Sequence, residues 1–340
     1  MRYPEFLAPE GRIGFIAPSF GCSTEPYKSA FDAALTLFRA RGCKTVPGPN
    51  CHEDKGLGKS NTPEACGAEI NDFFTNDRAD VIISCGGGET MCEDLPFVDF
   101  EAIKAAKPHW FLGYSDNTNL TFTLPTLCDT AAVYGPCAPS FGMQPLHPAV
   151  EDAFAVLTGK KDVFTNYDGW EKESLKSEED PFAPYNITEP YGMTVAGGGE
   201  AHFSGRLIGG CLDCLLNLCG TRFDKAADFA GRYKDDGIIW FLEACDLSAM
   251  GVRRGLWQLR EAGWFRHAAG FIIGRPYLFG EDFMGMSFDD AAREILGGLG
   301  VPILLNADLG HLPPMMPMVA GAVAKVDARD GEMKLQTLFI

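Results

Sequence analysis

The sequence predicts an α/β fold in two domains, and three observations indicate it. The chain has 340 residues, which is long for a single hydrophobic core. In its first half, short apolar runs alternate with amphipathic stretches, as in a parallel sheet covered by helices. A polar, Pro- and Gly-rich stretch then precedes a second alternating region. We therefore expect an N-terminal domain at residues 1–158, a linker and long loop at 159–200, and a C-terminal domain at 201–340.

Strands are expected to alternate with helices in the first half. Thr62-Pro63 provides an N-cap and a first-turn proline, which favours a helix start. Short apolar runs bounded by turn residues indicate strands. The expected strands are Arg12–Ala17, Cys43–Val46, Asp80–Ser84, Trp110–Leu112 and Val133–Tyr134, and the expected helices are Glu25–Arg41, Thr62–Phe74 and Asn117–Leu127.

The second half continues this alternation. It begins with FSGRLIGG at 203–210 and the helical pattern CLDCLLNLCG at 211–220. The strand GIIWFLEA at 237–244, an amphipathic helix at 250–263 and the strand GFIIGRP at 270–276 follow. The chain ends with VPILLNADLGH at 301–311 and the apolar MVAGAVAKVDA at 318–328.

The net charge of −17 argues against a polyanionic partner, because such binding needs clustered Lys and Arg. We expect neither nucleic acid nor a membrane as a partner. No stretch reaches the roughly 20 apolar residues of a membrane span. The first residues are charged and have no apolar segment typical of a signal peptide, so a cytoplasmic location is expected.

The twelve cysteines are typical of buried, reduced thiols, because they lie within apolar runs such as VIISCGGG and LPTLCDT. Cys211 and Cys214 form one C-x-x-C pair, but no second pair or histidine cluster completes a zinc site. We expect neither a metal nor a cofactor.

Ser115 follows an apolar strand and precedes an expected helix, in HWFLGYSDNTNL. Open α/β sheets bind ligands at this edge, and free amides at a helix start can stabilise an oxyanion. Serine is also a favoured helix N-cap, so a structural role stays open. The turn Cys85–Glu89 (CGGGE) follows another strand, and its amides could bind an anion or simply form a tight turn.

Glu243 closes the apolar strand IIWFLEA, where a carboxylate needs a partner. It could pair with Arg253 or Arg254, or it could orient an imidazole. His311 lies in DLGHLPPMMP, the most Gly- and Pro-framed setting of the six histidines.

Acyl transfer needs a nucleophile, an orienting acid and a base, and these three roles fit Ser115, Glu243 and His311. The elbow G-x-S-x-G is absent, so the residues permit a triad without requiring one. Two alternatives stay open. One is a non-catalytic α/β protein that binds a small anion at the glycine turn, and the other is a cysteine hydrolase that uses Cys85.

Several motifs together resemble the LD-carboxypeptidase family. They are GFIAPS, IISCGGGETMCEDLPFVDF, GYSDNTNL, FLEA with its W-x-L-x-x-x-G helix, GFIIGRP and DLGHLPPMMP. The similarity covers almost the whole chain in the same order. It implies a flavodoxin-like parallel-sheet N-terminal domain, a C-terminal α/β domain with a β-barrel-like sheet, an active site between them, and a homodimer.

The resemblance also implies roles for single residues. Ser115 is the implied nucleophile, with Glu243 and His311 as its relay. The implied reaction is serine carboxypeptidase hydrolysis of the L,D-peptide bond in a murein tetrapeptide, without a cofactor. The implied oxyanion donors are the amides of Gly86, Gly87, Gly88 and Asp116.

The chain departs from typical peptidoglycan-recycling members at the glycine turn, at Ala244 and in the long insert around Asp168–Tyr191. In these respects it resembles the microcin C immunity peptidase branch, whose members hydrolyse an aminoacyl-nucleotide-like amide. A small peptide or an aminoacyl nucleotide is therefore the expected substrate. Trp170 could stack on it, and the residues that could hold a terminal carboxylate are Arg206, Arg253 and Arg275.

Overall fold

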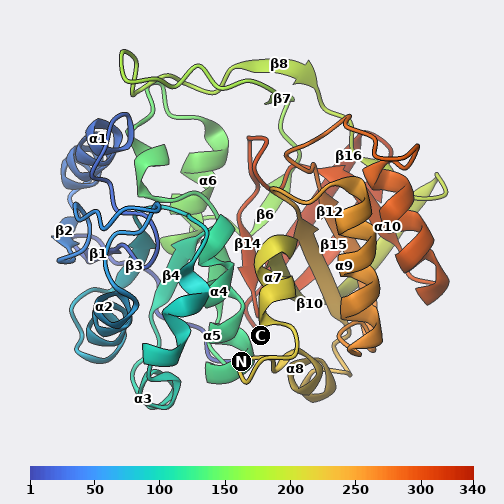
Figure 1. Cartoon of the computed structure of the whole chain (residues 1–340), viewed down its shortest axis with the longest axis horizontal. Coiled ribbons are helices and arrows are strands. Elements are labelled where there is room, and N and C mark those ends of the chain that lie inside the picture. Colours follow the sequence, from blue (N-terminus) through green and yellow to red (C-terminus); the bar gives the residue numbers. More distant parts are fainter.

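The computed structural model describes residues 1–340 as two main sheets that lie side by side (Figure 1). The first half of the chain, blue to green in Figure 1, forms most of a six-stranded sheet with the order β14-β5-β4-β3-β1-β2. All neighbours in it pair in parallel except β14, which is antiparallel to β5. Its strands are β1 (Arg12–Ile16), β2 (Lys44–Pro47), β3 (Val81–Ser84), β4 (Trp110–Gly113), β5 (Ala132–Tyr134) and β14 (Met318–Ala320).

The central strands are apolar throughout because both faces of this sheet are buried. In β3, Val81 and Ile83 belong to one hydrophobic cluster and Ile82 to another, on opposite sides of the pleat. Helices α1 and α6 contribute to the first cluster, and α2 and α3 to the second. The helices of this half are α1 (Tyr27–Ala40), α2 (Pro63–Thr75), α3 (Phe100–Ala105), α4 (Thr118–Thr121), α5 (Thr123–Cys128) and α6 (Pro148–Leu157).

Helix α2 begins as the sequence predicts, because the Thr62 side chain accepts a hydrogen bond from the Ala65 amide. The single helix predicted at Asn117–Leu127 is wrong. A 3₁₀ turn at Ser115–Asn117 leads into α4 and then α5. Pro125 has no amide hydrogen to donate to the carbonyl four residues earlier, at the end of α4, which accounts for the break.

The second sheet has the order β6-β16-β15-β10-β11-β12-β13-β9. Strands β10 to β13 pair in parallel, and the other neighbours are antiparallel. The strands are β6 (Val163–Thr165), β9 (Thr194–Val195), β10 (Glu200–Cys211), β11 (Ile238–Glu243), β12 (Ala268–Gly274), β13 (Ile303–Ala307), β15 (Val323–Arg329) and β16 (Glu332–Leu338). The helices beside it are α7 (Leu212–Leu218), α8 (Ala226–Arg232), α9 (Ala249–Glu261) and α10 (Phe288–Leu296).

This sheet curls, so that β9 at one end meets the turn between β15 and β16. The Gly331 amide in that turn donates to the Met193 carbonyl (3.0 Å), and the Val195 amide donates to Asp330 Oδ1 (2.8 Å). The predicted fold class is therefore confirmed: an α/β protein with a parallel N-terminal sheet and a curled second sheet.

The apolar segment at 318–328 divides between the two sheets. Strand β14 lies beside β5 in the first sheet, and β15 lies beside β10 in the second. Gly321 between them adopts a φ of 91°, which allows the chain to turn there without the penalty that a Cβ would bring.

The segment expected as a linker and long loop contains four short strands of two to four residues each. Strands β6 and β9 are edges of the second sheet, while β7 (Gly169–Glu171) and β8 (Ile187–Pro190) pair with each other. The β7–β8 ribbon and the loop between its strands run across the top of Figure 1, over both halves. Strands this short carry almost no periodicity, so the sequence did not indicate them.

One hydrophobic core joins the two halves. Phe122 from the first half stacks on Trp264, with ring centroids 5.1 Å apart, and Trp264 stacks on Trp240 of β11 at 5.8 Å. The chain ends also meet, because the Tyr3 hydroxyl donates to the Ile340 carbonyl (2.9 Å).

All twelve cysteines are free thiols; nine are buried and three are partly exposed. None of the helices combines the length and the apolar character that a membrane crossing requires.

Because Trp264 fills the junction between the halves, Trp264→Ala should lower the free energy of unfolding by about 3–5 kcal/mol. Trp257 on α9 is 52% exposed, so Trp257→Ala is the matched control and should change stability by less than about 0.5 kcal/mol. Urea unfolding followed by circular dichroism measures both. Similar losses in the two variants would contradict this account of the junction.

Candidate active site

Ser115 is held in an unusual backbone conformation at the end of β4. Tyr114 is extended, and Ser115 then turns to a φ of 62°, in the left-handed region that non-glycine residues seldom adopt. Such a conformation costs free energy and occurs at strand-to-helix turns that expose a nucleophile. The Ser115 hydroxyl lies 2.8 Å from Nε2 of His311.

His311 lies in the loop between β13 and β14. Its Nδ1 is 2.8 Å from Oε2 of Glu243, and the Tyr114 ring packs beside the imidazole at 5.3 Å. Gly310 before it has a φ of 107°, and a Cβ there would come within 2.8 Å of the Glu243 carboxylate. Only glycine allows the loop to bring His311 this close to Glu243.

Glu243 is the last residue of β11, and its side chain is fully buried. It accepts a hydrogen bond from the Tyr134 hydroxyl at 2.6 Å, and that hydroxyl accepts one from the Ser115 amide at 3.1 Å. Tyr134 on β5 therefore connects the two ends of the Ser115–His311–Glu243 chain. The sequence predicts a strand at Tyr134 but indicates no role for its hydroxyl.

The groups in this hydrogen-bonded chain shift one another's pKa values. Burial alone would raise the pKa of Glu243, but the His311 imidazole and the hydrogen bonds from His311 and Tyr134 outweigh it and lower that pKa. Burial alone would lower the pKa of His311, but Glu243 and the nearby Cys245 thiol raise it well above its ordinary value. Burial and the Glu243 charge raise the pKa of Tyr134, which keeps its hydroxyl protonated.

The glycine turn lies against the serine, since a Cβ on Gly87 would be 3.1 Å from Ser115 Oγ. The amides of Gly86, Gly87, Gly88 and Asp116 donate no hydrogen bond within the protein, which leaves them free for a ligand. The Asp116 carboxylate itself is occupied, because it accepts from Ser19 Oγ (2.6 Å) and the Met91 amide (2.9 Å).

A cavity of about 490 Å³ opens in front of Ser115 and His311. This volume is typical of small-molecule sites. The glycine turn forms part of its wall. The other lining side chains include the aromatic Phe20, Tyr27, Tyr114 and Tyr185 and the polar Ser140, Glu171, Ser174 and Lys176.

Arg206, which the sequence suggested for substrate binding, lies outside the Ser115 cavity. Arg206 is buried, pairs with Asp236 at 2.6 Å and donates to the Gly321 carbonyl. It is aligned with Ile238 at the start of β11, whereas Glu243 ends that strand, about 16 Å farther along at ~3.3 Å per residue.

Arg275 and Trp170, which the sequence suggested for substrate binding, have partners within the protein and lie outside the cavity lining. Arg275 is 1% exposed and forms an ion pair with the buried Asp308 (2.6 Å). Trp170 in β7 is 5% exposed, with the Arg275 guanidinium 5.2 Å from its ring and Phe279 against its edge. Neither Arg275 nor Trp170 lines the cavity. The residues between β7 and β8 that do line it, together with the end of β7, are Glu171, Ser174, Lys176 and Tyr185.

The structure also does not support the alternative roles considered for Arg253 and Cys85. Arg253 forms an ion pair with Glu294 and not with Glu243. Cys85 is buried beside Cys22 and Cys51, and burial raises its pKa well above the ordinary value, which disfavours a nucleophilic thiolate. No group of three or more His, Cys, Asp and Glu side chains is arranged to hold a metal ion.

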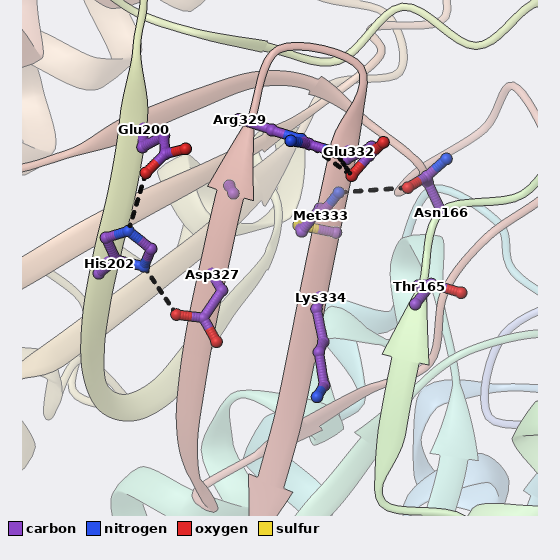
Figure 2. Close-up of a pocket in the computed structure, with 10 residues that line it drawn as sticks. Thr165, Asn166, Glu200, His202, Asp327, Arg329, Glu332, Met333 and Lys334 are labelled. Carbon is purple, nitrogen blue, oxygen red and sulfur yellow. Dashed lines mark hydrogen bonds and ion pairs between the residues drawn. The ribbon is translucent and has the colours of Figure 1, made fainter.

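Figure 2 shows another pocket, of about 530 Å³, on the outer strands of the second sheet. There His202 lies between Glu200 and Asp327, with Nδ1 2.8 Å from Asp327 Oδ1. The lining contains no serine or cysteine, and these three side chains are exposed. It therefore lacks the elements of acyl transfer that the Ser115 cavity combines.

Comparison with known proteins places the chain in a family. The model of the LD-carboxypeptidase N-terminal domain matches residues 13–135, and that of the C-terminal domain matches residues 204–326. The chain belongs to the LD-carboxypeptidase family. It is accordingly a serine peptidase, a hydrolase of peptide or amide bonds.

Two relatives and one solved structure are similar to the chain over most of its length. It is 27% identical to the microcin C7 self-immunity protein MccF of Escherichia coli over 332 residues, 94% of this chain and 92% of that protein. It is 23% identical to the murein tetrapeptide carboxypeptidase of Pseudomonas aeruginosa over 302 residues, 89% and 88% of the two chains. The structure of MccF in complex with glutamyl sulfamoyl guanosine matches with a TM-score of 0.81 at 24% identity, covering 99% of both chains. The predicted resemblance is confirmed.

From the buried Arg275–Asp308 ion pair we predict how the loss of its carboxylate changes the free energy of unfolding. Asp308→Ala leaves the buried Arg275 cation unpaired and should lower the free energy of unfolding by about 3–5 kcal/mol. The matched control is Glu332→Ala, which removes an exposed pair with Arg329 and should change it by less than about 1 kcal/mol. Denaturant unfolding compares them, and a loss below about 1 kcal/mol for Asp308→Ala would show that the pair is not structural.

Proposed function

We propose that this LD-carboxypeptidase family member hydrolyses an amide bond by acyl transfer, with Ser115 as nucleophile, His311 as base and Glu243 as the orienting acid. The observation that carries the proposal is the continuous hydrogen-bond chain from Ser115 Oγ through His311 to Glu243 at the wall of a cavity. It meets the requirement that a base contact the nucleophile and be oriented by a third group.

In the proposed first step, Ser115 Oγ attacks the substrate carbonyl carbon while His311 Nε2 takes the hydroxyl proton. The Glu243 carboxylate accepts a hydrogen bond from the Nδ1–H of His311, which leaves Nε2 unprotonated as the base and stabilises the imidazolium that forms. His311 then protonates the leaving amine, and the carbon–nitrogen bond breaks. Water, deprotonated by His311, releases the acyl group and restores the Ser115 hydroxyl.

The negative charge on the substrate oxygen needs donors close to Ser115. We assign this role to the free amides of the glycine turn, Gly86, Gly87 and Gly88, together with the Asp116 amide. Donors fixed by the backbone need no reorganisation during the reaction, and one such donor is worth about 10²–10³ in rate in other serine peptidases.

For the substrate we propose the L,D-carboxypeptidase reaction on a murein tetrapeptide, with cleavage of an aminoacyl-nucleotide amide as the second candidate. Similarity to the murein tetrapeptide carboxypeptidase supports the first. The second is favoured by the likeness to MccF and by the aromatic rings that line the cavity, since a nucleobase stacks well on flat rings. Hydrolysis of a tetrapeptide ending in D-Ala, side by side with an aminoacyl sulfamoyl adenosine, distinguishes the two.

The family resemblance also leads us to propose a homodimer in solution, which light scattering on the purified protein measures directly.

Ser115→Ala should reduce kcat by several orders of magnitude while leaving the folded structure intact, because it removes only the nucleophilic oxygen. Turnover of the better substrate, with circular dichroism as the check on folding, measures this. Labelling by a fluorophosphonate should disappear in the same variant. Cys85→Ala is the matched control and should keep labelling and turnover. Near-normal turnover in Ser115→Ala would remove the serine mechanism.

The raised pKa of His311 predicts the pH profile. His311 must be neutral to accept the Ser115 proton, so kcat/KM should rise as the pH passes through this pKa, with its midpoint above the ordinary value of about 6.5. In Glu243→Gln the residual activity should be lower and its midpoint should move down, because the charge that raises the pKa is gone. A wild-type midpoint at or below 6.5 would contradict the assignment of His311 as the base.

A further inference from the structure

One cation in the Ser115 cavity has no partner. Among the side chains that line this cavity, the acidic, lysine or histidine residues are Glu171, Lys176 and His311. Two of them are engaged: His311 with Glu243, and Glu171 with the Asn186 amide at 2.5 Å. The third is Lys176. Its backbone amide donates to Ser174 Oγ, but its ammonium group makes no ion pair or hydrogen bond within the protein.

In this position the Lys176 ammonium group loses part of its hydration, and no protein partner compensates for the loss. Burial lowers the pKa of Lys176, and the nearby Glu171 charge only partly opposes that effect. The chain has 46 acidic residues and a net charge of −17, so acids to neutralise a lysine are abundant elsewhere. A partly desolvated, unpaired cation at a cavity wall is stabilised when an anion enters the cavity.

The segment that carries Lys176 is fixed to the rest of the molecule. Its ends are joined by the pairing of β7 with β8, and the Glu171 amide donates to the Pro313 carbonyl at 2.7 Å, two residues after His311. Farther along, the Gln144 amide donates to the Phe182 carbonyl at 2.9 Å. The loop between β7 and β8, which carries Lys176 to the cavity, is therefore held by contacts with both halves of the molecule.

We propose that Lys176 binds the anionic group carried by the leaving amine. This rests on the proposed function. When an L,D-peptide is cleaved, the departing nitrogen belongs to an amino acid with a free carboxylate. When an aminoacyl nucleotide is cleaved, that nitrogen is bonded to a phosphoryl or sulfonyl group. Both place oxygens that accept hydrogen bonds next to the scissile bond, and Lys176 is the cavity's lysine, whose ammonium group can donate to them with a full positive charge.

The assignment replaces the arginines that the sequence suggested for the terminal carboxylate. It also gives a physical reason for cleavage at the end of a chain. A substrate that continues beyond the leaving residue would present a neutral amide to Lys176, and the ammonium group would then stay unpaired in the cavity.

The test uses the full-length protein and a matched pair of peptides. One is an L,D-tetrapeptide that ends in a free carboxylate, and the other is the same peptide as its terminal carboxamide. Lys176→Met should raise KM for the carboxylate peptide by about 10- to 100-fold, since a hydrogen bond to a charged group is lost. It should leave KM for the carboxamide within about twofold and change kcat little, because the contact is made in both the bound and transition states.

Two further variants separate charge from structure. Lys176→Arg keeps the cation and should retain most of the affinity for the carboxylate. Lys172→Met removes an exposed lysine of the same segment, outside the cavity, and should behave as wild type. Aminoacyl sulfamoyl adenosine serves as the second arm. A loss confined to this nucleoside identifies a phosphoryl or sulfonyl ligand, and a loss confined to the peptide identifies a carboxylate.

Binding without turnover keeps this test independent of the mechanism. In the Ser115→Ala background, calorimetry measures the affinity for both ligands with and without Lys176→Met. A tenfold or greater loss for either anionic ligand supports the assignment even if Ser115 proves not to be the nucleophile. Unchanged affinity for both anionic ligands, or equal weakening for carboxylate and carboxamide, would overturn it while leaving the proposed hydrolysis untouched.

Discussion

The buried carboxylate of Glu243 is the interaction on which the rest of the site depends. It is removed from water, so it must be satisfied by hydrogen bonds from the protein. Its partners are Tyr134 from the first sheet and His311 from the loop after β13. Satisfying this one charge therefore sets how the two sheets meet, and it fixes the imidazole beside Ser115.

Backbone geometry adds a second constraint at the same place. Ser115 occupies a left-handed conformation, which costs on the order of 1 kcal/mol or more for a residue with a Cβ. The Tyr134 hydroxyl accepts a hydrogen bond from the Ser115 amide, which helps to hold Ser115 in this conformation. Gly87 and Gly310 supply the space that closer contact requires, one beside the serine hydroxyl and one beside the carboxylate. The side-chain hydrogen bonds and the backbone conformation thus both fix the position of Ser115 Oγ.

The sequence was a good guide to features that depend on local pattern. Buried parallel strands appear as apolar runs, so the fold class and most elements were predicted. Ser115, Glu243 and His311 were also chosen as candidates, because each is a polar residue where an apolar strand or loop ends. Their contacts were not derivable by spacing, since 196 residues separate Ser115 from His311.

Features that depend on a distant partner were missed. Arg206 and Arg275 were expected to meet substrate, but Asp236 and Asp308 neutralise them inside the protein. Lys176 lies in a mostly polar and charged stretch, which does not single it out in the sequence. Its ammonium group is distinguished by the lack of a protein partner, which a sequence does not reveal. Tyr134 was hidden for the opposite reason, since a tyrosine in a buried strand is ordinary packing.

The placement of β14 has a consequence for synthesis on the ribosome. Strand β5 of the first sheet is complete once residue 134 has emerged, but the strand that covers its edge spans Met318–Ala320. At ~5–20 residues per second, that edge stays open on the order of ten seconds or more. An uncovered strand edge is a template for pairing with other chains. Because β5 has only three residues, the exposed template is short during this interval, which limits unwanted association of unfinished chains.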